Sequence, residues 1–294
     1  MKLVPPIRKI RDALPLLLFL LAGSAHAQSP VWQIEKHGNL LFIAGSLHIL
    51  TAEDYPLPPA FETAYRQSGR MVFETDVSRM ESPEFQQYLL REVSFSDGRN
   101  LRDVLRADTY RALEDFFVSR GVPMTGIDGF KPGMVAMLMT IIELQRLGIN
   151  GAGVDAHLNQ RAAQEQKPRG QLETVEQQVA FIANLGVGQE DEMLNYNLAD
   201  MQRLPELWQF MSQAWRDGDL PWLEENIALP MREDFPAVYQ SLLVERNNAW
   251  IPQLEAMSKT AQVEFVVVGA LHLSGANGLL SQLAARGYRI TQLP

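Results

Sequence analysis

The sequence contains no cysteine among its 294 residues. A catalytic thiol, a disulfide framework and a thiolate metal site are therefore all excluded. Two common catalytic patterns are also missing. The chain has neither the H-E-x-x-H pattern of helical zinc sites nor the G-x-S-x-G turn that presents a serine nucleophile. Any chemistry must therefore come from histidine, carboxylate or other polar side chains in a different arrangement.

Basic residues are also fewer than acidic ones. Lysine and arginine total 26 against 35 aspartate and glutamate residues, which gives a net charge of −9. The first 27 residues carry four basic side chains and one acidic one, so residues 28–294 carry −12. Binding to nucleic acid or to an anionic membrane would bring negative charge to negative charge. We therefore expect no nucleic-acid partner.

Long apolar runs are rare, and the segment 14–22 is the most prominent one. It follows a basic stretch at 2–11 and precedes Ala25-His26-Ala27, which together form the three parts of a secretory signal peptide. An apolar run of about ten residues is too short for a comfortable membrane span, although an uncleaved anchor is the alternative. We predict cleavage before Gln28, a periplasmic or extracellular location, and no stable membrane span in the single domain 28–294.

Two segments have the pattern of a buried strand that ends in glycine. Both are apolar and rich in branched residues, and they run into Gly45 and Gly269. Each begins a predicted strand-helix-strand unit, in which a crossover helix joins two parallel strands. The N-terminal unit comprises strand 40–44, helix 58–67 and strand 71–73, and the C-terminal unit comprises strand 263–268, helix 278–286 and strand 288–293.

The chain between these units is mainly helical in pattern, with one short strand next to Leu172. No Ser/Gly-rich linker indicates a second domain. The sequence therefore predicts an α/β fold with a mixed, largely parallel sheet, built from the two strand-helix-strand units, and a large helical middle. The helices expected in that middle are 82–93, 109–120, 133–147, 154–166, 175–185, 191–218 and 237–259.

The two glycine-ended strands share a longer motif, Gly45-Ser46-Leu47-His48 and Gly269-Ala270-Leu271-His272. Glycine ends a strand, turns sharply and leaves room for the imidazole three residues later to face a ligand. Taken singly, each histidine is more simply explained as a hydrogen-bonded structural residue. Because α/β folds place their sites at the carboxyl ends of parallel strands, the pair predicts a site, together with Glu74 after strand 71–73.

Neutral imidazoles and a carboxylate are ligands that suit a divalent transition metal such as zinc, manganese or cobalt. Two histidines and one carboxylate leave positions open for water, and a metal-bound water becomes a usable hydroxide near neutral pH. The pattern therefore predicts a hydrolytic metal site. Ser46 is a poor candidate for a nucleophile, because Ala270 stands at its place in the second motif.

Further polar residues have two interpretations each. Asp155 is either a helix N-cap or a carboxylate of the site. Glu173 is a metal ligand, a general base or the first-turn acid of a helix that Thr174 caps. Arg246 faces solvent, or it holds a substrate carboxylate or an oxyanion. His157, close to Asp155, is better explained as structural.

These motifs together resemble the TraB/GumN family, which is related to the Tiki metalloproteases. The resemblance covers nearly all of residues 28–294 in order. It implies an erythromycin-esterase-like α/β fold and a metal-dependent peptidase activity whose two histidines and glutamate map onto His48, His272 and Glu74. The segments that carry it are Leu41 to His48, Glu74, Gly153-Val154-Asp155, Leu172-Glu173-Thr174, Glu245-Arg246-Asn247, and Val268 to Leu273 with Gly275 and Gly278.

We therefore expect a secreted metal-dependent hydrolase that acts on peptide or protein amide bonds. Its metal ligands would be His48, Glu74, Asp155 and His272. Glu74 would act as the general base, and Glu173 and Arg246 would orient the substrate or water. Two alternatives stay open: a non-catalytic periplasmic protein that binds a metal or haem, and an esterase-type enzyme in which histidine is a metal-free general base.

Overall fold

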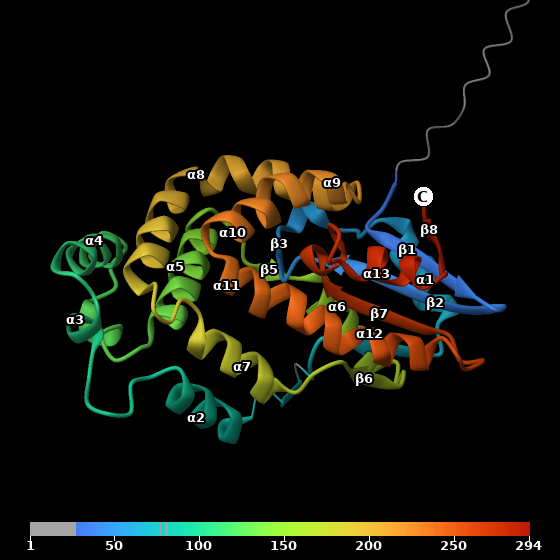
Figure 1. The fold of residues 1–294 in the computed structure, drawn as a ribbon, viewed down its shortest axis with the longest axis horizontal. Helices are drawn as coiled ribbons and strands as arrows, with labels where there is room; N and C mark the ends of the chain where they lie inside the picture. Colours follow the sequence, from blue (N-terminus) through green and yellow to red (C-terminus); the bar gives the residue numbers. More distant parts are fainter. Residues whose placement is uncertain (1–27, 77, 80–81) are drawn as a thin grey trace, which may run out of the picture.

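The computed structural model describes residues 28–76, 78–79 and 82–294, so the expected signal peptide lies outside the described residues. The sheet and the C-terminus lie at one end of the molecule, and a group of helices extends from the sheet to the other end (Figure 1). Among the described residues, no helix is both long and apolar enough to cross a membrane.

The described strands form a six-stranded sheet in the order β6-β4-β7-β2-β1-β8. Strands β6, β4, β7 and β2 are parallel to one another, whereas β1 is antiparallel to both β2 and β8. The expected mixed, largely parallel sheet is therefore confirmed. The bounds are β1 Val31–Lys36, β2 Asn39–Ser46, β4 Arg70–Phe73, β6 Arg169–Gln171, β7 Glu264–Gly269 and β8 Arg289–Gln292.

The two strand-helix-strand units are interleaved in this sheet. Strand β7 lies between β2 and β4, and it pairs with β2 from Phe42 opposite Phe265 to Ser46 opposite Gly269. The N-terminal unit, which runs through α1 (Pro59–Gln67), therefore has its two strands separated by the first strand of the C-terminal unit. This order brings the two Gly-x-Leu-His turns next to each other. Strand β1 has no counterpart among the elements expected from the sequence.

Helices cover both faces of the sheet. On one face, α1 and α6 (Val154–Gln164) pack Phe61 and Leu158 against the apolar side chains of β2, β4 and β7. On the other face, α12 (Arg246–Met257) and α13 (Leu279–Ala285) pack Trp250 and Leu283 in the same way. Burial on both faces explains why β7 is apolar through its middle rather than alternating.

The helical end of the molecule has a core of its own, which α3, α4, α5 and α8 share. The expected helices are present, with ends that differ by a few residues. The expected helix 237–259 contains a wider π-type turn, Gln240–Glu245, between α11 and α12. The remaining helices are α2 Pro83–Glu92, α3 Leu101–Val104, α4 Ala107–Val118, α5 Pro132–Arg146, α7 Val175–Asn184, α8 Glu190–Arg216, α9 Leu220–Leu223, α10 Leu229–Asp234 and α11 Pro236–Tyr239.

Candidate functional site

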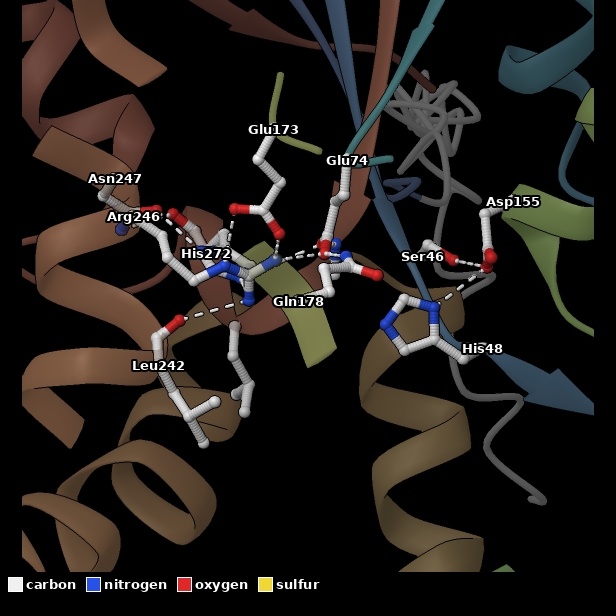
Figure 2. Close-up of polar contacts among 12 residues, drawn as sticks. Ser46, His48, Glu74, Asp155, Glu173, Gln178, Leu242, Arg246, Asn247 and His272 are labelled. Carbon is white, nitrogen blue, oxygen red and sulfur yellow. Dashed lines mark hydrogen bonds and ion pairs between the residues drawn. The ribbon is translucent and has the colours of Figure 1, made fainter. Parts of the chain in front are cut away.

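Four neighbouring parallel strands each place one polar residue at their carboxyl ends. In sheet order these are Glu173 after β6, Glu74 after β4, His272 after β7 and His48 after β2. Figure 2 shows their side chains on the same side of the strand ends, with Glu74 between His272 and His48. Residues that are as much as 224 positions apart are thus gathered by strand order alone, because His48 and His272 end adjacent strands.

Gly269 marks the place where three of these side chains meet. A β-carbon on this glycine would lie 3.3 Å from Oε1 of Glu74, 3.5 Å from Cδ2 of His272 and 3.7 Å from Nε2 of His48. Any larger residue would therefore fill the space that the three groups share. The close approach gives this position of the second motif a reason to be glycine.

His48 is held through its inner ring nitrogen. Its Nδ1 lies 3.1 Å from Oδ1 of Asp155, and the Ser46 hydroxyl donates to the same oxygen at 2.6 Å. Asp155 reaches this position because Gly153, two residues before it, packs its α-carbon against the His48 backbone, where a side chain would clash. The His48 side chain is 62% exposed, and it lines the pocket with Nε2 facing the space beside Gly269.

The pair of His48 and Asp155 favours a protonated imidazole. Desolvation acts to lower the pKa of His48, but the hydrogen bond and negative charge of Asp155, with the charge of Glu74, raise it above its ordinary value. Burial likewise acts to raise the pKa of Asp155, and the bonds from His48 and Ser46 outweigh it and lower that pKa. The expected resting state is an ion pair of imidazolium and carboxylate.

Arg246 donates a hydrogen bond from each of its five N–H groups. Nε and Nη2 bind the two carboxylate oxygens of Glu173 at 3.0 and 2.6 Å, and Nη2 also binds Oε2 of Glu74 at 2.6 Å. Nη1 donates to the Leu242 carbonyl at 3.3 Å and to Nε2 of His272 at 3.0 Å. The guanidinium therefore has its donors committed within the protein, and it holds the two glutamates together.

Local helix geometry places Arg246 at the centre of this cluster. It is the first residue after the π-type turn, and such turns are frequent at functional sites because they redirect side chains. Its guanidinium lies 4.7 Å from the ring centre of Trp250 and 5.4 Å from that of Phe181. These apolar and aromatic neighbours keep water away from the ion pairs, which strengthens them.

Glu74 is an ionised carboxylate, and both of its oxygens accept hydrogen bonds. Oε1 accepts the backbone N–H of Gly269 at 2.6 Å, and Oε2 accepts Gln178 at 3.2 Å as well as Arg246. Burial acts to raise the pKa of Glu74, but the positive charges of Arg246 and His48 and the hydrogen bond from the Gly269 N–H hold that pKa well below its ordinary value. In Glu173, by contrast, burial prevails and raises the pKa.

His272 is neutral and has a defined tautomer. Arginine can only donate, so Nε2 of His272 accepts from Arg246, and Nδ1 carries the proton that it donates to Oδ1 of Asn247 at 2.7 Å. Asn247 in turn donates to the His272 carbonyl at 3.2 Å. Burial lowers the pKa of His272 to about 3. The two motif histidines thus differ, one cationic and exposed, the other neutral and buried.

These groups open into a pocket of about 370 Å³. The floor is polar where the strands end, and the wall toward the helical part of the molecule is apolar. His272 and Glu173 stand behind this surface, where they contact Arg246. The lining residues that carry the argument are Ser46, His48, Glu74, Asp155, Ile182 and Leu242.

The profile of the TraB/PrgY/gumN family matches residues 30–292, which is almost the whole described chain. The chain belongs to the TraB/PrgY/gumN family. The uncharacterized protein YbaP of Escherichia coli (strain K12) is 27% identical over 263 residues, covering 88% of this chain and 93% of that protein. The uncharacterized protein YbaP of Shigella flexneri is 26% identical over 252 residues, covering 84% and 88%. No solved structure matches the chain significantly.

Two interpretations from the sequence need correction in this TraB/PrgY/gumN chain. Gly153, not Asp155, is the N-cap of α6, and Asp155 lies in the first helical turn, where the helix dipole also favours its negative charge. Arg246 does not face solvent, since it is 8% exposed and its N–H groups donate within the protein, and its role toward a substrate carboxylate or oxyanion stays a prediction. Thr174 does cap α7, as expected.

Three further residues of this TraB/PrgY/gumN chain hold side chains of the site in place, although their sequence patterns did not single them out. Ser46 supports Asp155, Asn247 fixes the tautomer of His272, and Gln178 binds Glu74. Asn247 had a signal, since it is the neighbour of Arg246 in the motif that carried the family resemblance. Gln178 had none, because nothing distinguishes it from any other polar residue of a helix.

A divalent metal does not fit the side chains as they are arranged here. Among the described residues, no group of three or more His, Asp or Glu side chains is placed to hold a metal ion. The lone pair of His272 Nε2, which a metal would need, is directed at Arg246. Metal binding by His48, Glu74, Asp155 and His272 would need these side chains to rearrange, and it stays a prediction.

Proposed function

We propose that this protein is a hydrolase of peptide amide bonds in which Glu74 and His48 transfer protons on either side of the scissile bond. The observation that carries the proposal is the shared space beside Gly269, where Oε1 of Glu74 and Nε2 of His48 both face the pocket. A carboxylate and an imidazolium that approach one small space from two directions form a general base and a general acid.

The charges favour this assignment of roles. Glu74, with its pKa lowered, is ionised and has a lone pair for a proton, although the low pKa makes it a weak base. His48, with its pKa raised by Asp155, carries a proton on Nε2 toward the pocket. The cluster contains three carboxylates and one guanidinium: Arg246 binds Glu74 and Glu173, while Asp155 binds His48, whose proton supplies a second positive charge. Neutralising this excess of negative charge is a physical reason for His48 to stay protonated.

The steps balance with water as the second reactant. Water attacks the carbonyl carbon and gives its proton to Glu74 as the C–O bond forms. His48 gives its proton to the amide nitrogen as the C–N bond breaks, so that an amine and a carboxylic acid leave. The proton on Glu74 then returns to His48. Arg246 and Glu173 act as positioning residues, since they hold Glu74 in place.

The same charge imbalance is the reason to keep a second candidate, a metal-dependent peptidase. A divalent cation such as Mn²⁺, Co²⁺ or Zn²⁺ would also offset three carboxylates. It would need Arg246 to leave Nε2 of His272, where it stands at 3.0 Å. The proposed steps do not involve this cation. The same proposal includes an erythromycin-esterase-like fold related to that of the Tiki proteases. It also includes secretion to the periplasm or exterior through a signal peptide in residues 1–27.

The decisive experiment is a peptide-library cleavage assay on the mature protein, residues 28–294, after dialysis against a chelator. We expect cleavage to survive chelation, and we expect His48→Ala and Glu74→Gln to lose it by at least a hundredfold, about the contribution of one acid-base group. His157→Ala is the matched control, because the His157 ring packs at a tilt against Tyr55, with ring centres 5.0 Å apart, and His157 does not line the pocket.

Other outcomes discriminate among the alternatives. Cleavage that returns only when Mn²⁺, Co²⁺ or Zn²⁺ is added, with stoichiometric metal by elemental analysis, supports the metal-dependent peptidase. Hydrolysis of simple esters without any peptide cleavage supports the esterase-type enzyme. Stoichiometric metal or haem with neither activity supports the binding protein. Equal activity in His48→Ala and in the wild type rejects the proposed roles altogether.

A further inference from the structure

A second cavity adjoins the pocket on the side of the helices. It has a volume of about 390 Å³, and it shares Ile182 and Leu242 with the pocket that holds His48. Leu242 stands directly beside Arg246 in Figure 2, so the shared wall lies next to the polar cluster. Its other large apolar side chains include Met137 of α5, Met193 and Tyr196 of α8, Met231 of α10, Val238 of α11, and Phe235, which lies between α10 and α11.

The lining of this cavity suits an apolar group of variable shape. Met137, Met193 and Met231 have flexible, polarizable side chains that adapt to irregular partners. Tyr196 and Phe235 form an edge-to-face pair with ring centres 5.1 Å apart at its rim, and Tyr196 is 36% exposed. An apolar cavity that adjoins a polar pocket is the usual form of a specificity site.

We propose that this cavity is a subsite for a large apolar side chain of the peptide substrate, close to the scissile bond. The proposal rests on the proposed function, because the cavity has meaning as a subsite only if the pocket with His48 and Glu74 is the reacting site. It adds the substrate class: peptides with leucine, methionine or phenylalanine beside the cleaved bond, in preference to small or polar residues.

Polar groups in the cavity favour a peptide over an acyl chain. Asn197, Asp200, Asn226 and Thr140 interrupt the apolar lining. Thr140, Asn197 and Asn226 each donate one hydrogen bond to the backbone carbonyl four residues earlier, so their oxygens and the Asp200 carboxylate are the acceptors that face a ligand. A bound hydrocarbon chain would take these acceptors out of water without offering them a donor, which is costly. A peptide brings its own N–H and C=O groups beside the apolar side chain, and Asp200 and the amide side chains are suitable partners for them.

The test uses binding, so that it does not depend on cleavage. Fluorescein-labelled decapeptides of glycine and serine, with a leucine or phenylalanine at one position moved along the chain, are titrated against the His48→Ala protein. We expect the best apolar peptide to bind about tenfold to a hundredfold more tightly than the all-polar peptide, as burial of one large apolar side chain predicts.

Val238→Trp, added to His48→Ala, fills the cavity and should abolish this preference while leaving the weak binding of the polar peptide unchanged. Val118→Trp is the matched control, because Val118 is 58% exposed on α4, away from both cavities. Circular dichroism of each variant establishes that it is folded. A second variant, Met231→Gln, tests the same wall without added bulk, and it should weaken the preference.

The failures can be told apart. If the apolar preference depends on Val238 but no peptide is cleaved by the protein with His48 intact, the cavity is a binding site for apolar peptide side chains and the proposed function fails. If peptides are cleaved but leucine and serine peptides bind equally, or Val238→Trp affects both equally, the subsite is wrong. Tight binding of a p-nitrophenyl octanoate analogue, with no apolar peptide bound, overturns the peptide occupant in favour of an acyl chain.

Discussion

Nη1 of Arg246 lies 3.0 Å from Nε2 of His272, and this contact determines the chemical state of both residues. Because arginine only donates, Nε2 of the imidazole accepts this hydrogen bond. The ring proton is therefore on Nδ1, which donates a hydrogen bond to Oδ1 of Asn247. The guanidinium then directs its remaining N–H groups at Glu173, Glu74 and the Leu242 carbonyl. In the proposed function His272 therefore takes no part in proton transfer, and His48 is the histidine that does.

Arg246→Ala should destabilise the protein by about 3–5 kcal/mol, because it leaves two buried carboxylates side by side without their cation. The measurement is urea unfolding at pH 7 followed by circular dichroism. Arg66→Ala is the control, since its pair with Glu62 is exposed and should contribute at most about 1 kcal/mol. Equal losses in the two variants would show that the buried cluster adds no stability of its own.

Asp155→Asn should shift the pH dependence of activity. Asp155 raises the pKa of His48, so removing its charge lowers that pKa toward the ordinary value of about 6.5. Since the proposed acid is protonated His48, the alkaline limb of kcat should move to lower pH. NMR titration of the His48 ring measures the same shift without substrate. An unchanged His48 titration in Asp155→Asn would refute this electrostatic account.

The two motif glycines should respond differently to alanine. A β-carbon at Gly45 would lie 3.1 Å from Cβ and 3.2 Å from Cα of Ala270, so Gly45→Ala should cost about 1–3 kcal/mol of stability through overpacking. At Gly269 the nearest atom is Oε1 of Glu74 at 3.3 Å. Gly269→Ala should therefore change stability little, but it should reduce kcat about a hundredfold, because the methyl occupies the space of the attacking water.

Thermal unfolding and steady-state kinetics on both glycine variants check this contrast. If Gly269→Ala retains full activity, the space beside Gly269 is not where the reaction takes place.

His272 should make stability fall as the solution becomes acidic. The unfolded chain binds a proton at His272 below a pKa of about 6.5, whereas the folded protein resists protonation down to about 3. Between these values the unfolded state binds more protons, so the free energy of unfolding decreases as the pH falls. At pH 5 this amounts to about 1–2 kcal/mol relative to pH 7.

Urea unfolding of the wild type and of His272→Gln at pH 7 and pH 5 measures this effect. The variant should lose less stability between the two pH values, because glutamine does not titrate. An equal loss in both proteins would mean that His272 titrates normally in the fold.

Local signals in the sequence determined much of this protein. Apolar runs that end at Gly45 and Gly269 specified two buried strands, since strand patterns and glycine turns are encoded by adjacent residues. They placed His48, His272 and Glu74 at the carboxyl ends of parallel strands, which the structure brings together. Helix positions followed from periodicity in the same way.

Tertiary structure alone decided the order of the strands and the partners of the polar groups. Whether β7 lies beside β2 or beyond β4 depends on how helices pack on both faces, and no local pattern records that choice. The same holds for Arg246, whose sequence context is that of an ordinary helix although all its donors are used within the protein. Hydrogen bonds between residues as distant as Glu74 and Arg246 exist only once the whole fold has formed.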